Sequence, residues 1–102
     1  MADFVRVISA AELPPGSCRE AMVSGKAVAL CNAGGTFHAI DNRCSHRGGP
    51  LGQGALDGTM LYCPWHAWTW DVTTGVSTVN PDIRVARYDV KVQNGDVFVK
   101  VE

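Results

Sequence analysis

Two cysteines and two histidines in the middle of the chain form a pair of matching metal-binding motifs. Cys44 and His46 are separated by one residue, Cys63 and His66 are separated by two, and 16 residues lie between the motifs. Each motif offers one thiolate and one imidazole, a ligand set that suits zinc or iron–sulfur chemistry. Zinc sites usually group their ligands by type, whereas both motifs here mix Cys with His. The sequence therefore predicts a four-ligand metal centre, for which a structural zinc ion is the plainer interpretation.

Mixed motifs also allow the two kinds of ligand to separate, because both thiolates can bind one iron while both imidazoles bind the other. This is the asymmetric arrangement of a Rieske [2Fe-2S] cluster. The segments CSHRGGPLGQG and CPWHAW resemble the two cluster-binding loops of the Rieske family, and the resemblance covers nearly the whole chain. It implies one [2Fe-2S] cluster as cofactor, with four ligands: Cys44, His46, Cys63 and His66.

The resemblance also implies how the loops present the cluster. Each imidazole would bind iron through one ring nitrogen and expose the other at the tip of the protein, where electrons leave. Apolar residues beside the ligands are expected to form a collar around the imidazoles; they are Pro50, Leu51, Pro64 and Trp65. Of these, we expect Pro50, Leu51 and Trp65 to contact a partner protein.

Glycines 48, 49, 52 and 54 follow the first ligand pair. We expect them to bring backbone N–H groups close to the cluster sulfurs, which requires close approach and unusual φ angles. A plain surface loop would be glycine-rich as well. A phosphate-binding loop is excluded, because neither a Lys-Ser/Thr pair nor a helical pattern follows.

Short strands joined by tight turns are predicted on both sides of this region. The runs of alternating polarity are separated by two-residue turn sequences, which are Ser24-Gly25, Gly34-Gly35 and Asn94-Gly95. One short helical turn is expected after Ser9, which would cap it. The expected fold class is all-β: a small antiparallel β-barrel or sandwich base domain with an inserted two-loop cluster-binding subdomain.

The length, charge and apolar runs of the sequence limit the class of protein. We expect one Rieske domain over residues 1–102, with the cluster-binding region at about residues 43–70. The 9 basic and 10 acidic residues occur without runs, which argues against nucleic acid or a membrane surface as partner. No apolar stretch approaches the roughly 20 residues of a membrane span, and the first residues lack a secretory pattern. We therefore expect a cytoplasmic protein.

Cys18 and Cys31 are expected to be free thiols, because cytosolic reductants oppose disulfides. The Ser24-Gly25 turn places them opposite each other on neighbouring strands, with Cα atoms about 4.5–5.5 Å apart. Neither is expected to bind the cluster.

The number of histidines separates electron transfer from oxygenase chemistry. Rieske oxygenases also hold a mononuclear iron with two histidines and a carboxylate. Only His38 remains here once the cluster has taken two of the three histidines. We expect it on a strand surface, facing away from Phe37 and Ile40. The chain is therefore expected to carry single electrons and not to act as an enzyme by itself.

Within the family, the sequence resembles the ferredoxins that carry electrons from a flavin-containing NAD(P)H reductase to the terminal oxygenase of a bacterial ring-hydroxylating system. A free carrier of this kind is expected to be a monomer. Two other functions remain open. One is the small Rieske-like subunit of an assimilatory nitrite reductase, and the other is a zinc-stabilised binding module without a redox role.

Residues of the second loop predict a low reduction potential. In high-potential Rieske proteins, as the resemblance implies, hydroxyl groups donate hydrogen bonds to the cluster from positions that are Trp68 and Trp70 here. A disulfide also braces the loops of those proteins, and its positions are Gly49 and Trp65 here. Fewer donors stabilise the reduced state less. The indole N–H of Trp68 is the substitute donor that the sequence offers. Trp68, Trp70 and Phe98 are otherwise assigned to the base-domain core.

Overall fold

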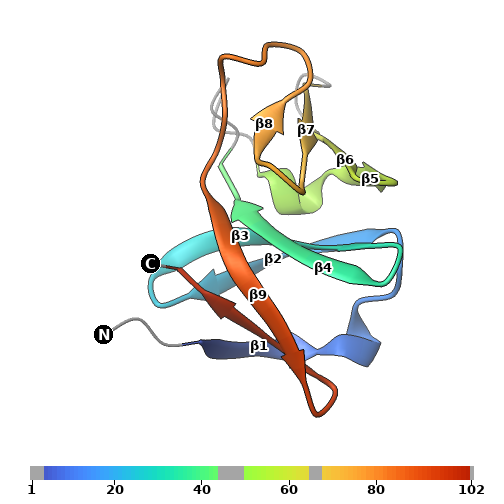
Figure 1. Cartoon of the computed structure of the whole chain (residues 1–102), viewed down its shortest axis with the longest axis vertical. Coiled ribbons are helices and arrows are strands. Elements are labelled where there is room, and N and C mark those ends of the chain that lie inside the picture. The colour runs from blue at the N-terminus through green and yellow to red at the C-terminus, as the bar shows by residue number, and fades with distance from the viewer. Residues whose placement is uncertain (1–3, 44–49, 65–67, 102) are drawn as a thin grey trace.

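Ten strands and two short 3-10 turns make up the described part of the chain, which covers residues 4–43, 50–64 and 68–101 of a computed structural model (Figure 1). The strands are β1 (Val5–Ser9), β2 (Ser17–Val23), β3 (Lys26–Ala33), β4 (Thr36–Asp41), β5 (Ala55–Asp57), β6 (Met60–Tyr62), β7 (Thr69–Asp71), β8 (Val76–Ser77), β9 (Arg87–Gln93) and β10 (Asp96–Lys100). The 3-10 turns are η1 (Ala10–Glu12) and η2 (Leu51–Gln53). All pairings between these strands are antiparallel, and the predicted all-β class is confirmed.

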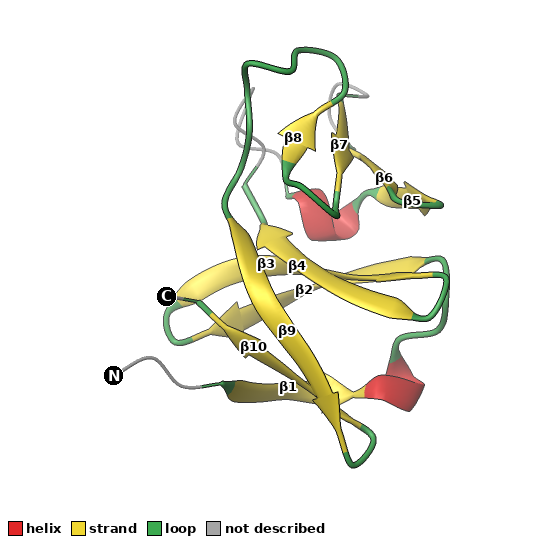
Figure 2. Ribbon diagram, viewed as in Figure 1, coloured by secondary structure: helices red, strands yellow, loops and turns green. Residues whose placement is uncertain are grey.

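Six strands form one curved sheet in the order β1-β10-β9-β4-β3-β2, which nearly closes into a barrel (Figure 2). Its edge strands β1 and β2, at opposite ends of this order, contact each other. Apolar side chains fill the interior; they are Ile8, Leu13, Val23, Val28, Leu30, Ala39, Val97, Val99 and Val101. This barrel is the predicted base domain.

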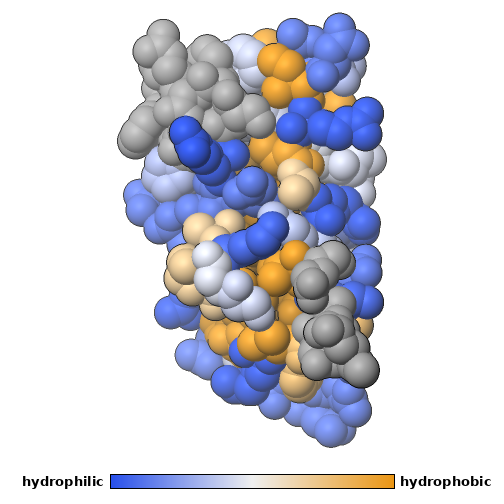
Figure 3. All heavy atoms as spheres, turned by 90° about the vertical axis from the view of Figure 1, so that its left-hand side faces the viewer, coloured by the Kyte–Doolittle hydropathy of each residue, from blue (hydrophilic) through white to orange (hydrophobic). Residues whose placement is uncertain are grey.

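The other four strands form a small sheet in the order β5-β6-β7-β8 at one end of the barrel (Figure 1). The sheet is inserted between β4 and β9 and continues to Ser77, past the expected limit near residue 70. A second buried cluster joins it to the barrel; its members are Ala29, Cys31, Ile40, Leu51, Leu61, Cys63, Trp70, Val72 and Val85. Apolar residues also run between barrel and insertion on one face of the molecule (Figure 3). The two parts therefore share a core.

Two-residue turns set the register of the barrel hairpins. Ser24 and Gly25 both have positive φ, which is the type I′ geometry that matches the twist of two antiparallel strands. The predicted turn between β9 and β10 has the same geometry. The first turn pairs Cys18 with Cys31, so this predicted juxtaposition is confirmed.

The three aromatic residues assigned to the base-domain core lie in two different surroundings. Trp70 is fully buried, but in the core shared with the insertion, and Trp68 packs against the same cluster. Val97 and Val99 face the barrel interior, so strand alternation turns Phe98 outward. There the Nζ of Lys91 lies 5.5 Å from the centroid of the Phe98 ring. The assignment of Phe98 to the core is therefore wrong.

The expected helical turn after Ser9 is η1. Ser9 occupies the N-cap position with extended backbone, but its hydroxyl makes no capping hydrogen bond. The turn ends where the Leu13 amide donates to the Ala10 carbonyl oxygen at 3.2 Å. The helices in the described part of the chain are too short to reach across a membrane.

Candidate metal centre

The two predicted ligand loops start from neighbouring parts of the fold. The first leaves the barrel after β4, and a β-bridge between Arg43 and Pro50 joins its ends. The second leaves the small sheet after β6, and the Cys63 amide donates to the Trp68 carbonyl oxygen across it at 2.7 Å. Leu51 follows the first loop, Cys63 opens the second, and both belong to one buried cluster. The fold therefore brings the ends of both loops to the end of the molecule that carries the small sheet (Figure 1).

Cys63 is the predicted ligand that lies within the described residues. Cys63 is 2% exposed, and its side chain packs in the same buried cluster as Leu61 of β6. Cys44, His46 and His66 lie outside the described residues, so the ligand set stays a prediction. Among the residues that are described, Cys, His, Asp and Glu side chains form no group of three or more that is placed to hold a metal ion. The structure thus defines the stems of the loops and the core beneath them.

Asn42 fixes the stem of the first loop with all of its polar groups. Its backbone N–H donates to the Ala27 carbonyl oxygen at 3.1 Å, and its carbonyl oxygen accepts from the Leu51 amide at 2.7 Å. Its Oδ1 accepts from the Gly52 amide at 2.7 Å, and its Nδ2 donates to Glu20 at 2.6 Å. Asn42 is 8% exposed, so these bonds are shielded from water. The stem is thereby tied to both β2 and β3.

Glu20 holds two side chains of this stem. One carboxylate oxygen accepts from Asn42, and the other accepts from Gln53 Nε2 at 2.7 Å. These hydrogen bonds, first that of Gln53 and then that of Asn42, favour the ionised form and lower the pKa of Glu20. Neither Asn42 nor Glu20 could be predicted from the sequence, because their contact joins positions 22 apart and neither residue belongs to a motif.

Gly52 and Gly54 are required by close packing. A Cβ atom at position 52 would lie 2.6 Å from Cγ of Glu20 and 2.7 Å from its backbone nitrogen. A Cβ atom at position 54 would overlap the carbonyl oxygen of Tyr62. A larger residue at position 52 would push η2 away from β2, and one at position 54 would push it away from β6. Gly52 therefore lets the insertion pack against the barrel, and Gly54 lets η2 pack against the small sheet.

The amides of these two glycines are used within the protein. The Gly52 amide donates to Asn42 Oδ1, and the Gly54 amide donates to the Leu51 carbonyl oxygen at 3.0 Å. The expectation that they point at cluster sulfurs is therefore wrong, because packing of the stem takes both donors. Glycines 48 and 49 lie outside the described residues.

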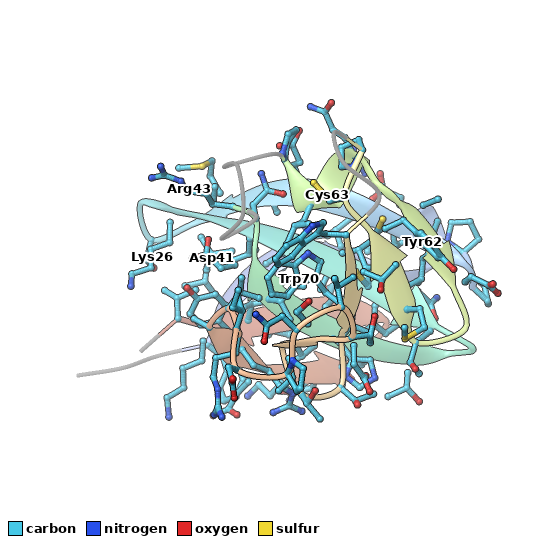
Figure 4. The ribbon with its side chains drawn as sticks, turned by 90° about the horizontal axis from the view of Figure 1, so that it is seen from above. Lys26, Asp41, Arg43, Tyr62, Cys63 and Trp70 are labelled. Carbon is cyan, nitrogen blue, oxygen red and sulfur yellow. The ribbon has the colours of Figure 1, made fainter. Side chains whose placement is uncertain are left out.

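The apolar collar differs from expectation in one member. Pro64 is exposed and Pro50 is half-buried. Leu51 is fully buried, because the η2 turn directs its side chain into the shared core, so its predicted contact with a partner is wrong. Trp65 lies outside the described residues. Tyr62, which is 39% exposed, projects outward at the end of β6 and was not singled out by any motif (Figure 4).

Two thiols lie where the barrel meets the insertion. Cys31 is fully buried, and Cys18 lies opposite it on β2. The neighbouring Cys31 thiol lowers the pKa of Cys18, whereas Cys18, followed by burial, raises the pKa of Cys31. The Cys18 thiol also donates to the carbonyl oxygen of Gly54 at 3.2 Å. Both are free cysteines, and Cys18 adds a further contact between barrel and insertion.

His38 continues this row on β4, directly opposite Cys31. It is half-buried, and burial, followed by the positive charge of Arg87, lowers its pKa. The expectation that His38 faces away from Ile40 is wrong, because strand residues two positions apart share a face. His38 therefore lies on the outer face of the barrel sheet, on the side that the insertion covers, and faces away from Phe37 as expected.

Comparison with known proteins places this arrangement in a family. The sequence profile described as the Rieske [2Fe-2S] domain matches residues 3–93. The chain belongs to the Rieske family. The match extends through the barrel strands on both sides of the insertion, so that base and ligand loops are covered by one family description.

Several Rieske relatives are ferredoxins of dioxygenase systems. The ferredoxin component of the naphthalene 1,2-dioxygenase/salicylate 5-hydroxylase systems of Ralstonia sp. is 34% identical over 92 residues, which cover 89% of this chain and 88% of the relative. The solved ferredoxin of carbazole 1,9a-dioxygenase from Nocardioides aromaticivorans IC177 is 31% identical with a TM-score of 0.91, covering 97% of this chain and 98% of that one. A chain in the solved complex of reduced oxygenase and oxidized ferredoxin in carbazole 1,9a-dioxygenase is 29% identical with a TM-score of 0.87, covering 95% of this chain and 92% of that one.

The Rieske assignment implies a [2Fe-2S] cluster, and the described residues fit one. Cys63 supplies a thiol at the edge of a buried apolar cluster. Beside it in that cluster is Trp70, whose Nε1 is buried and has no hydrogen-bond partner among the described residues. Buried polar groups in folded proteins are nearly always paired. An unpaired donor next to a candidate ligand is what a site for a sulfur-rich acceptor would contain.

Proposed function

We propose that the chain is a soluble, cytoplasmic one-electron carrier, a Rieske ferredoxin that passes electrons from an NAD(P)H-dependent flavoprotein reductase to a terminal oxygenase. In this proposal Cys44 and Cys63 bind one iron of the cluster, and His46 and His66 bind the other. The observation that carries the proposal is the similarity to ferredoxin components of dioxygenase systems, which spans most of this chain and most of each relative.

The histidine content supports a carrier over an oxygenase subunit. The chain has three histidines, of which the proposal assigns two to the cluster. The third, His38, lies in a row with two thiols on the barrel. A two-histidine, one-carboxylate iron site cannot be built from the histidine that remains. In this proposal the electrons pass to an iron site in another protein.

The residues around the candidate centre hold the stems of the ligand loops in place. When bound, the cluster supplies a centre that takes up and returns one electron. Asn42 and Glu20 fix the stem of the first loop, and the Cys63 amide closes the second. Leu51 and Trp70, both fully buried, exclude water beneath the loops. A site prepared in this way needs little rearrangement when its charge changes.

Metal analysis tests the cluster and its ligands. The purified protein is expected to be red-brown, with about two irons and two acid-labile sulfides per chain. His46→Ala and His66→Ala are expected to lose the cluster, because each removes an iron ligand. His38→Ala is the matched control, since it removes the histidine outside the loops, and it should keep the cluster. One equivalent of zinc without labile sulfide would contradict the proposal and support the zinc-stabilised module.

Reconstitution tests the role as a carrier. The loaded protein is expected to run as a monomer in size-exclusion chromatography and to restore NAD(P)H-driven turnover to a mixture of flavoprotein reductase and ring-hydroxylating oxygenase. A nitrite reductase subunit would instead expose an apolar interface and aggregate when it is alone. A loaded chain that aggregates and transfers no electrons to an oxygenase would contradict the carrier role.

A further inference from the structure

Trp70 places an unpaired hydrogen-bond donor in the core below the ligand loops. The residue is fully buried, and its Nε1 has no partner among the residues that the structure describes. Folded proteins pair the great majority of such groups. This N–H therefore marks a position at which an acceptor is to be bound.

Strand pairing directs the Trp70 side chain toward the second ligand loop. Trp70 on β7 lies opposite Leu61 on β6, so both residues face the same side of the small sheet. Cys63 comes two positions after Leu61 and faces that side as well. Cys63 and Trp70 are therefore diagonal neighbours across two strands. Their backbones are about 7–8 Å apart, a distance that a long aromatic side chain spans. Both belong to one buried cluster, and Figure 4 shows them close together from the loop end of the molecule.

The side chain of Ser77, on the other strand next to β7, already has hydrogen-bond partners. Ser77 lies opposite Trp70 on β8. Its hydroxyl oxygen accepts from the amides of Val79 and Asn80 at 3.2 and 3.3 Å. Its O–H donates to the Thr69 carbonyl oxygen at 3.3 Å. The described members of the surrounding cluster are apolar side chains and thiols, so they offer the indole no oxygen acceptor.

We propose that the indole N–H of Trp70 donates a hydrogen bond to a sulfur of the bound [2Fe-2S] cluster and thereby stabilises its reduced state. This inference rests on the proposed function, because it requires the cluster. Reduction adds one negative charge to the centre, and hydrogen bonds to charged acceptors are stronger than those to neutral ones. The bond therefore favours the reduced form, and Trp70 raises the potential without binding iron. One indole donor in place of the two hydroxyls of high-potential relatives still leaves the centre in the lower half of the Rieske range.

Trp68 is the alternative donor suggested by the sequence. Its ring centroid lies 6.2 Å from that of Trp70. Trp68 is only half-buried, whereas Trp70 is fully buried and its N–H has no partner among the described residues. The two indoles are similar in chemistry and differ in burial, which makes Trp68 a matched control.

Midpoint potentials of the loaded variants test the proposal. Trp70→Phe removes the N–H and keeps an aromatic ring, and Trp70→benzothienylalanine removes the N–H and also keeps the shape of the indole. Both are expected to shift the equilibrium between the two oxidation states about tenfold toward the oxidised form, which is about 59 mV for one electron. Trp68→Phe is expected to shift it much less. If Trp70→Phe fails to load, the shape-preserving analogue carries the comparison.

Pulsed EPR of the reduced protein supplies a readout that a purely structural role would not change. With isotopically labelled indole nitrogens in a Trp65→Phe background, a hyperfine coupling is expected when Trp68 and Trp70 are both present and in Trp68→Phe, and its loss is expected in Trp70→Phe. An unchanged potential with benzothienylalanine, or a coupling that survives Trp70→Phe, would overturn the assignment. Iron and sulfide are measured first: an empty protein refutes the proposed function, whereas a loaded protein with an unchanged potential refutes only the role of Trp70.

Discussion

Replacing Asn42 with alanine is expected to free the stem of the first ligand loop from the barrel. The change removes the acceptor of the Gly52 amide and the donor to Glu20. The Gly52 N–H then stays buried without a partner, which costs about 1–3 kcal/mol. If the stem is weakened by about 2 kcal/mol, at about 1.36 kcal/mol per factor of ten, it opens about 30 times more often.

The rate at which the loaded protein loses its cluster reports this opening. An iron chelator is added and the bleaching of the visible absorbance is followed, and the rate should rise about 30-fold in Asn42→Ala if opening precedes chelation. Gln53→Ala is the control, because it removes only an exposed hydrogen bond to Glu20, and it should change the rate by no more than about twofold. Far-ultraviolet circular dichroism should stay unchanged in both variants. A rate in Asn42→Ala within about twofold of the wild type would refute the idea that Asn42 anchors the loop.

Three further predictions follow from the stem, the thiols and the loops. Hydrogen bonds lower the pKa of Glu20 from its ordinary 4.5, so their stabilisation is complete above that value and is lost as pH falls through the lowered pKa. Cluster loss should therefore accelerate in acid, and less so in Glu20→Gln; equal pH profiles would argue against this anchor. Replacing both Cys18 and Cys31 with Ser or Ala should leave the visible spectrum of the loaded protein unchanged, and loss of the chromophore would show that a ligand had been misassigned. Protein-film voltammetry at about pH 7 should give a midpoint potential below zero, in the lower half of the Rieske range of about −150 to +300 mV, whereas a value above about +150 mV would rule out a low-potential carrier.

The barrel hairpins can be predicted from the sequence because their signals are local. The Ser24-Gly25 turn favours type I′ geometry within two residues, and its register alone brings Cys18 opposite Cys31. The ligand motifs are local in the same sense, since each places a thiol and an imidazole within four residues. Signals of this kind do not depend on the rest of the fold.

Features set by distant contacts could not be predicted in this way. Leu51 stands among glycines and reads as a loop residue, but the η2 turn buries it against strands far away in the sequence. Phe98 shares its face of β10 with Asp96 and Lys100, and the alternation puts Val97 and Val99 on the buried face, so its aromatic character alone was a poor guide to burial. Strands β5 to β8 have only two or three residues each, too few for a period to appear. Asn42 gains its role only when β2 lies beside it.

The insertion leaves the barrel and returns to it at a single seam. The Asp41 amide donates to the Ala86 carbonyl oxygen at 2.8 Å, and Ile40 pairs with Arg87 in the next position of the ladder. Chain ends that meet in this way can carry an excursion of almost any length, as domains tolerate inserted segments where their termini lie close together. The candidate cluster-binding part is thus an insertion that leaves and re-enters the barrel sheet at one point. Grafting ligand loops of another length onto the stems, with the strands of the insertion that share the core kept, should change the bound group without changing the register of the barrel strands.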